Sequence, residues 1–144
     1  MQYKIMAPKA INSTIALPAS KSISNRALIL NGLSLNASTL ENLSDCDDTQ
    51  VMIEALRSGS SLIDVKAAGT SMRFLTALLA ITPGEWIITG TERMQERPIN
   101  ILVEALTSLG ARISYIANIG YPPLKIKGTA LDGGDIYLSG DVSS

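Results

Sequence analysis

Two segments combine cations and hydroxyl groups where helices are expected to begin, and they hold the residues best suited to chemistry. In Ala19–Arg26, Lys21 and Ser22 lie on the turn and Arg26 lies one helical turn later. The unpaired N–H groups and the dipole of a helix N-terminus favour an anion, and two cations strengthen that preference. Arg26 interrupts an apolar helix without an acidic neighbour, so an anionic ligand is favoured over the alternative, a serine cap between two solvated cations.

The second segment, Ala68–Arg73, repeats this chemistry. Gly69 lets a ligand approach the backbone, and Arg73 takes the place of Arg26. Two related turns that both keep an unpaired Arg predict two related anion sites, although a Gly-Thr cap on a core helix is the simpler alternative. A third segment, Glu92–Pro98, alternates Glu and Arg, which is typical of solvated surface pairs worth about 0.2–0.5 kcal/mol each.

The size of the ligand that such turns can hold follows from the strength of their contacts. Hydrogen bonds to charged groups contribute about 1.5–3 kcal/mol each, and micromolar binding needs about 8 kcal/mol after ordering costs. Roughly four to six contacts would therefore hold one phosphorylated metabolite. The P-loop and dinucleotide fingerprints are absent from the sequence, so ATP and NAD lack support.

Composition narrows the chemistry further. The 144 residues suffice for one domain, and 12 Lys and Arg against 13 Asp and Glu argue against nucleic-acid binding. The absence of His removes the commonest acid–base group and the usual zinc ligand, and a single Cys excludes an internal disulfide. No apolar run is long enough for a membrane span or a signal peptide. The expectation is a soluble cytoplasmic α/β domain without a membrane partner.

Hydrophobic periodicity predicts the elements that position these residues. Helices are expected at 22–35, 47–59, 72–81 and 98–110, and strands at 14–18, 38–43, 85–89, 112–116, 124–127 and 135–138. The first and third helices are apolar almost all round, which predicts burial on nearly all sides. The other two helices are amphipathic.

These elements form a pattern that occurs twice. Arg26 and Arg73 are 47 residues apart, and Glu54–Leu56 precedes Glu104–Leu106 by 50. An internal duplication of buried helix, strand, amphipathic helix and strands explains both spacings, and chance similarity of two units is the alternative. Ser139–Ser144 is a third turn of the same chemistry, which suggests a chain that stops at a helix N-cap, and a polar tail is the simpler alternative.

Five motifs resemble the signatures of the 5-enolpyruvylshikimate-3-phosphate synthase family, in order and along the whole chain. They are Leu17–Leu28, Ala68–Ala77, Thr89–Ile99, Gly120–Leu124 and Gly140–Ser144. The resemblance implies an N-terminal third of a longer protein. It also implies two lobes, each of three βαβαββ units with helices buried inside and sheets outside. Residues 1–19 would be a leading strand belonging with the absent C-terminal lobe, and 20–144 a partial N-terminal lobe of about two units.

The resemblance also implies an activity and the residues that serve it. Members of the family transfer the enolpyruvyl group of phosphoenolpyruvate to the 5-hydroxyl of shikimate 3-phosphate, without metal or cofactor, on the route to chorismate and the aromatic amino acids. Residues resembling the contacts to shikimate 3-phosphate are Lys21, Ser22, Arg26, Ser143 and Ser144, and those resembling the contacts to phosphoenolpyruvate are Lys21, Gly69 and Arg97. No catalytic residue is carried over, because the family's proton-transfer carboxylate lies in the second lobe.

Two departures from the family pattern and two other hypotheses remain. Ala67 stands where an Asn is usual, and the segment 59–66 is short, so the first unit is expected to lack part of its strand hairpin. The alternatives are a UDP-N-acetylglucosamine enolpyruvyl transferase relative and a non-catalytic phosphometabolite-binding domain. The parent enzyme is expected to be monomeric and the chain alone inactive, with a risk of self-association through uncovered apolar helix faces.

Overall fold

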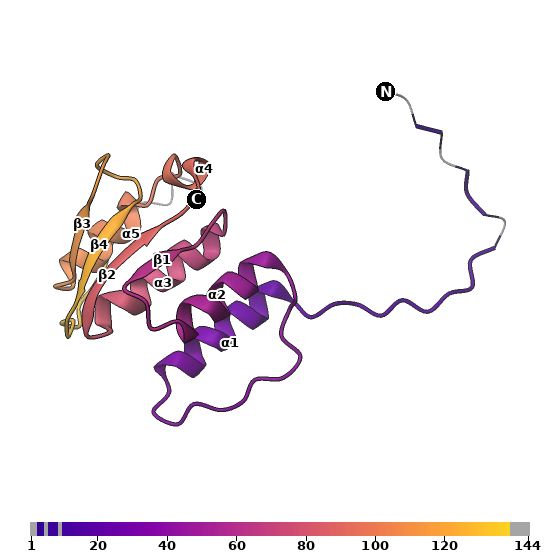
Figure 1. The fold of residues 1–144 in the computed structure, drawn as a ribbon, viewed down its shortest axis with the longest axis horizontal. Helices are drawn as coiled ribbons and strands as arrows, with labels where there is room; N and C mark the ends of the chain where they lie inside the picture. Colours follow the sequence, from indigo (N-terminus) through magenta and orange to yellow (C-terminus); the bar gives the residue numbers. More distant parts are fainter. Residues whose placement is uncertain (1–2, 5, 9, 139–144) are drawn as a thin grey trace.

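The computed structural model describes residues 3–4, 6–8 and 10–138. The elements in these ranges are α1 (Lys21–Leu33), α2 (Asp47–Arg57), β1 (Leu62–Asp64), α3 (Gly69–Ile81), β2 (Gly84–Thr89), α4 (Glu92–Gln95), α5 (Asn100–Ser108), β3 (Arg112–Tyr115) and β4 (Leu124–Gly128). The sheet lies on one side of α3, and α1 and α2 lie on the other (Figure 1). No helix among these residues is long and apolar enough to cross a membrane.

The four strands form one mixed sheet in the order β1-β2-β4-β3. β1 runs parallel to β2, whereas β4 is antiparallel to both β2 and β3, with Ile88 opposite Leu124. Leu124 and Ile126 are fully buried while Lys125 and Lys127 are exposed, as expected for a strand with one face against a core. The prediction of helices inside and a sheet outside is confirmed.

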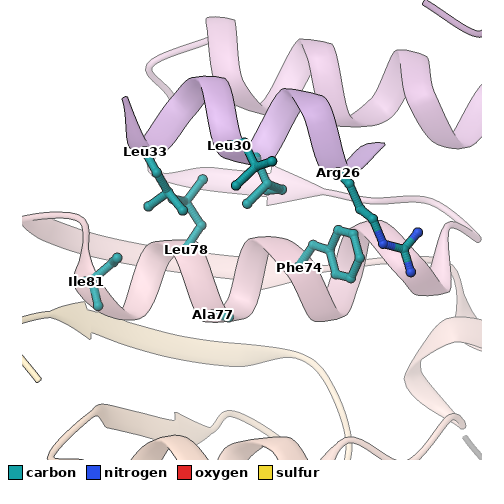
Figure 2. Close-up of a pocket in the computed structure, with 8 residues that line it drawn as sticks. Arg26, Leu30, Leu33, Phe74, Ala77, Leu78 and Ile81 are labelled. Carbon is teal, nitrogen blue, oxygen red and sulfur yellow. The ribbon is translucent and has the colours of Figure 1, made fainter. Parts of the chain in front are cut away.

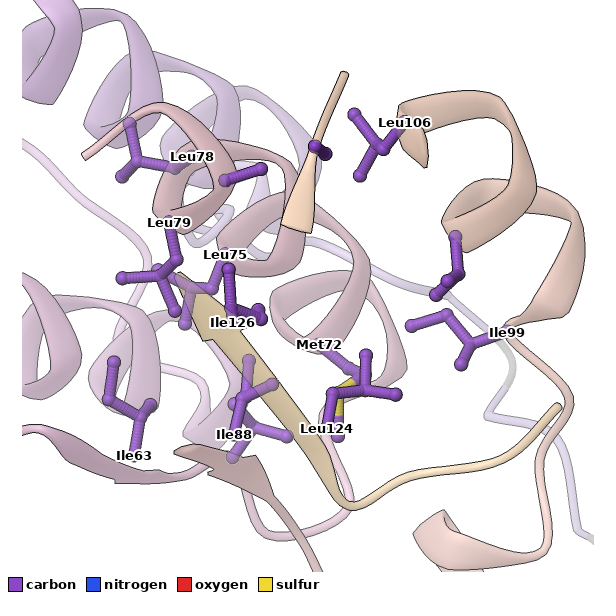
Figure 3. Packing of buried hydrophobic residues seen from close by; sticks show 14 of the residues in the cluster. Ile63, Met72, Leu75, Leu78, Leu79, Ile88, Ile99, Leu106, Leu124 and Ile126 are labelled. Atoms are coloured by element: carbon purple, nitrogen blue, oxygen red, sulfur yellow. The ribbon is translucent and has the colours of Figure 1, made fainter. Parts of the chain in front are cut away.

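Helix α3 forms the centre of the core. Met72, Leu75 and Leu79 lie against the inward face of the sheet, close to Ile88 and Ile126 (Figure 3). Each is at most 5% exposed, and full burial of such a side chain contributes about 1.5–3 kcal/mol. The prediction that this helix is buried on nearly all sides is correct.

Helix α1 forms as predicted, but its expected burial is wrong for this chain. Ile23, Leu30 and Leu33 are 70%, 67% and 50% exposed, while the polar Ser24 and Asn25 are buried. The cause is that α1 has neighbours only on the side that faces α2 and α3, and no described residue covers its other side. An apolar stripe therefore remains in contact with solvent.

Three of the predicted strands do not form. Residues 14–18, 38–43 and 135–138 carry no strand, and β1 was not predicted because it is only three residues long. In the α1–α2 loop, the Asn31 side chain donates to the Ser38 carbonyl at 3.0 Å and accepts from its N–H at 2.8 Å. This satisfies the backbone groups that a strand would use for pairing. Residues 10–19 run away from the helices, and no strand of the described residues pairs with them (Figure 1).

The structure supports the internal duplication. Helices α1 and α3 each have 13 residues and lie side by side in the same direction (Figure 2). The Nη1 atom of Arg26 donates to the Ser22 carbonyl at 3.0 Å, and that of Arg73 donates to the Gly69 carbonyl at 3.2 Å. The same side chain therefore makes the same contact at equivalent places in both units.

Candidate functional site

The first turns of three helices meet around Asp48. Lys21 at the start of α1 donates from Nζ to Asp48 Oδ2 at 3.0 Å, and Ser71 in the first turn of α3 donates from Oγ to the Asp48 carbonyl at 3.0 Å. Asp48 itself lies in the first turn of α2. Because the dipole of each helix is positive at its N-terminus, this end of the molecule favours negative charge.

The three helices begin here for local reasons. The Ser20 hydroxyl accepts from the Ile23 N–H at 3.4 Å and caps α1, whereas Asp47 and Asp48 complement the dipole of α2. Helix α3 begins at Gly69 after a tight turn in which Lys66 has a φ of 53°. No side chain among the described residues caps α3, so its first N–H groups are open to a ligand.

A layer of buried polar groups holds α1 against α2 behind these turns. The Thr49 hydroxyl donates to Asn25 Oδ1 at 2.9 Å, and the Ser44 N–H donates to Ser24 Oγ at 2.9 Å. Asn25 and Thr49 are both fully buried, and Asn25 Nδ2 has no partner among the described residues. The layer therefore fixes the placement of the two helices but leaves one donor unsatisfied.

Replacing Thr49 by Val tests this layer. The variant keeps the shape of the side chain but removes the donor to Asn25 Oδ1. Both polar atoms of the buried Asn25 amide are then without a partner among the described residues. We expect the free energy of unfolding to fall by about 1–3 kcal/mol, measured by urea unfolding. Thr107→Val on the exposed face of α5 is the matched control, and an equal effect in both variants would contradict a special role for the layer.

Arg97 lies directly against Gly69. A Cβ added to Gly69 would be 2.9 Å from Arg97 Cζ and 3.1 Å from Nη2, and closer still to Nη1. The Arg97 N–H donates to the Met94 carbonyl at 3.1 Å, which attaches its backbone to α4. The residue at position 69 therefore has to be glycine for the guanidinium to take this place.

Arg73 lies beside Arg97. Its equivalence with Arg26 predicts that it binds an anion, but its side chain is used differently. Its Nη1 and Nη2 atoms donate to the carbonyls of Gly69 and Pro98, each at 3.2 Å. Burial lowers the pKa of Arg73, and the charge of Arg97 lowers this pKa further. Arg73 thus holds backbone groups together, and Arg97 carries the guanidinium that is open to a ligand.

Arg26 lies at the end of a groove between α1 and α3. Its guanidinium carbon is 5.7 Å from the centre of the Phe74 ring, a cation–π distance, and the side chain is exposed (Figure 2). Within the described ranges, neither Arg26, Arg73 nor Arg97 forms an ion pair. Arg26 and Arg97, which lie near helix N-termini, are therefore suited to bind phosphate or carboxylate anions.

Most of the predicted site residues lie at the N-terminal ends of α1 and α3. Lys21, Ser22 and Arg26 lie in the first two turns of α1, while Gly69 and Arg97 meet at the start of α3. The predicted Ser143 and Ser144 lie outside the described residues. Lys21 is paired with Asp48, and this contact raises the pKa of the Lys21 ammonium.

Sequence reasoning missed two residues of this site. Asp48 was expected only as part of the helix at 47–59, and nothing in the spacing of the sequence indicated its contact with Lys21. The role of Ser71 was also missed, although it follows the Gly-Thr pair directly. Ala67 is exposed and lines a cavity of about 380 Å³ with Asp47, Glu54 and Lys66.

Comparison with known proteins gives a consistent result. The family model described as EPSP synthase (3-phosphoshikimate 1-carboxyvinyltransferase) matches residues 5–62 and 58–144. A 3-phosphoshikimate 1-carboxyvinyltransferase from Bacteroides fragilis (strain YCH46) is 62% identical over 144 residues, covering 100% of this chain and 35% of that protein. The enzyme of the same name from Shewanella piezotolerans is 40% identical over 169 residues, covering 99% of this chain and 40% of that protein.

Among solved structures, the EPSP synthase from Acinetobacter baumannii matches with a TM-score of 0.79 at 22% identity, covering 90% of this chain and 35% of that chain. This match shows the fold. The chain spans 35% of the length of the Bacteroides protein and 40% of the length of the Shewanella protein. On the match of the family model to nearly all of its residues, the chain belongs to the EPSP synthase (3-phosphoshikimate 1-carboxyvinyltransferase) family.

Proposed function

We propose that the protein carrying this chain transfers the enolpyruvyl group of phosphoenolpyruvate to the 5-hydroxyl of shikimate 3-phosphate and releases inorganic phosphate. The observation that supports this most strongly is the convergence of the first turns of α1, α2 and α3 with Arg26 and Arg97, neither of which has a carboxylate partner among the described residues. Both substrates carry phosphate, and guanidinium groups and helix N-termini are suited to bind it.

Within this proposal the two units divide the substrates between them. Lys21, Ser22 and Arg26 on α1 bind shikimate 3-phosphate, together with Ser143 and Ser144. The Gly69 turn and Arg97 bind phosphoenolpyruvate, and Lys21 contacts both. Since α1 and α3 lie side by side in the same direction (Figure 2), the two substrates are held next to each other. Such positioning contributes a large part of the barrier reduction in a reaction between two substrates.

The bond changes require residues that this chain does not provide. The 5-hydroxyl oxygen forms a bond to the enolpyruvyl carbon, the carbon–oxygen bond to phosphate breaks, and protons move on and off the intermediate. The described residues near Arg97 include no carboxylate that contacts it. We propose that the proton-transfer group and further phosphoenolpyruvate cations come from the remainder of the longer protein, so that the chain by itself binds but does not catalyse.

The arrangement of lobes is part of the same proposal. We assign residues 1–19 to a strand of the second lobe and 20–144 to about two of the three units of the first. The groove between α1 and α3 has a volume of about 400 Å³. It is lined by Arg26, Ile29, Leu30, Leu33, Phe74, Ala77, Leu78 and Ile81. A third unit covers this groove in the whole protein, which is a monomer of the cytoplasm, and the isolated chain self-associates through it.

Other candidate functions receive less support. The relatives compared above are 3-phosphoshikimate 1-carboxyvinyltransferases, and none of them is named as a UDP-sugar enolpyruvyl transferase. Ala67 stands where an Asn that contacts phosphoenolpyruvate is usual, and the methyl side chain of Ala67 cannot make that hydrogen bond. The shikimate 3-phosphate half of the site is accordingly the more completely represented half.

An enzyme assay of the full-length protein and of residues 1–144 tests the proposal. With both substrates present, we expect the full-length protein to release one phosphate for each enolpyruvyl product formed, and the chain alone to release none. Phosphate release is measured by a colorimetric assay and the product by mass spectrometry. Turnover by residues 1–144 alone, or no turnover by the full-length protein, would contradict the account.

A further inference from the structure

Two neighbouring guanidinium groups at the start of α3 differ in what they contact. Arg73 is half-buried and uses two of its nitrogens on backbone carbonyls, those of Gly69 and Pro98. Arg97 is exposed, and within the part of the chain that the structure describes its guanidinium forms no ion pair and no hydrogen bond that would satisfy its donors. One arginine is therefore committed to the protein and the other is open to an anion.

The contacts of Arg73 join two segments that are far apart in the sequence. Gly69 is the first residue of α3, and Pro98 follows Arg97 directly and lies 25 residues beyond Arg73. The bond to the Pro98 carbonyl therefore fixes the backbone next to Arg97 relative to the first turn of α3. The backbone of Arg97 is attached on its other side by its N–H bond to Met94. Because the backbone is held on both sides of Arg97, the Arg97 side chain extends over Gly69 from a fixed Cα position.

Comparison with Arg26, the corresponding arginine of the first unit, identifies the contact that is specific to Arg73. Arg26 makes the same Nη1 bond to the carbonyl four residues earlier, but its guanidinium lies over the Phe74 ring and makes no second bond to a carbonyl among the described residues. The two copies of the turn thus differ in one contact. In the first copy the arginine faces the groove, and in the second copy it supports another arginine.

We propose that Arg73 is a positioning residue that holds Arg97 over Gly69 by fastening the Arg97–Pro98 backbone to the first turn of α3. The role rests on the proposed function, because it assigns Arg97 to phosphoenolpyruvate. Its physical basis does not depend on the substrate: a bidentate guanidinium that bridges two carbonyls is a rigid link that Lys cannot reproduce. The like charge of Arg97 nearby makes an anion at this place still more favourable.

Steady-state kinetics of the full-length protein test the proposal with Arg73→Gln, Arg73→Lys and, as the control, Arg57→Gln at the exposed end of α2. We expect the KM for phosphoenolpyruvate to rise about tenfold or more in both Arg73 variants, and the KM for shikimate 3-phosphate to stay within about twofold, since only the α3 turn is changed. Arg73→Lys keeps the charge but loses the bridge. Full recovery of the phosphoenolpyruvate KM by Lys, or equal rises in both KM values, would overturn the proposal.

A second readout does not depend on enzyme activity. In residues 1–144, NMR signals of the arginine Nε–Hε groups are followed while inorganic phosphate is added. We expect the Arg97 signal to shift in the unaltered chain and to lose most of that response in Arg73→Gln, while the Arg26 signal responds equally in both. An unchanged Arg97 response would contradict the positioning role. Failure of the proposed function is recognised separately, as absence of turnover in the unaltered full-length protein.

Discussion

Replacing Gly69 by Ala is expected to reduce kcat/KM of the full-length protein by about 100-fold or more, which corresponds to about 2.7 kcal/mol. The added Cβ would lie 2.9 Å from Arg97 Cζ, a separation that real Cβ atoms essentially never show. Because the contact is with the far end of a flexible side chain, Arg97 moves away and the backbone stays in place. Anion binding at the α3 turn is lost while the fold is kept.

Kinetics and unfolding of the Gly69→Ala variant together distinguish an effect on the site from an effect on the stability of the fold. The KM for phosphoenolpyruvate is expected to rise sharply, and the urea-unfolding free energy of the variant to stay within about 1 kcal/mol of the original. Gly133→Ala is the matched control, because nothing lies within 4 Å of its added Cβ. A Gly69→Ala variant with unaltered phosphoenolpyruvate kinetics would show that Arg97 does not contact this substrate.

Replacing Arg26 by Ala is the second change with a large expected effect. Arg26 is exposed, so its loss removes charge from the site without opening a cavity in the core. On the proposed assignment, the substitution leaves the phosphate without the guanidinium that α1 supplies to it. We expect the KM for shikimate 3-phosphate to rise about 100-fold, and that for phosphoenolpyruvate to change little. Initial rates measured with each substrate varied in turn show this difference, and equal rises for both substrates would contradict the assignment.

Local patterns in the sequence were sufficient for much of the fold. Helix α2 and strand β4 show clear apolar periods, and the equivalent positions of Arg26 and Arg73 in the sequence indicate the duplication. Periodicity failed where burial depends on distant residues. The sequence of α1 is apolar all round, yet which of its faces is covered depends on which other elements are present, and here Ile23 and Leu30 lie in solvent.

The site was predicted in type but not in detail. Helix starts with cations indicate an anion site, because that preference comes from local dipoles and charges. The roles of Arg73 and Asp48 depend on contacts 25 and 27 residues apart in the chain, and such contacts leave no local pattern. The Glu-Arg segment at 92–98 looked like surface charge for the same reason: only the fold brings Arg97 onto Gly69.

Direct binding of shikimate 3-phosphate to residues 1–144 tests the central claim most directly, because it needs neither the second lobe nor turnover. Isothermal titration calorimetry on the unaltered chain, Arg26→Ala and the control Arg57→Ala distinguishes a specific site from general attraction to cations. The account predicts saturable binding at one site in the unaltered chain and in Arg57→Ala, and no measurable binding in Arg26→Ala. Equal affinity in all three proteins would contradict the assignment of the α1 turn to this substrate.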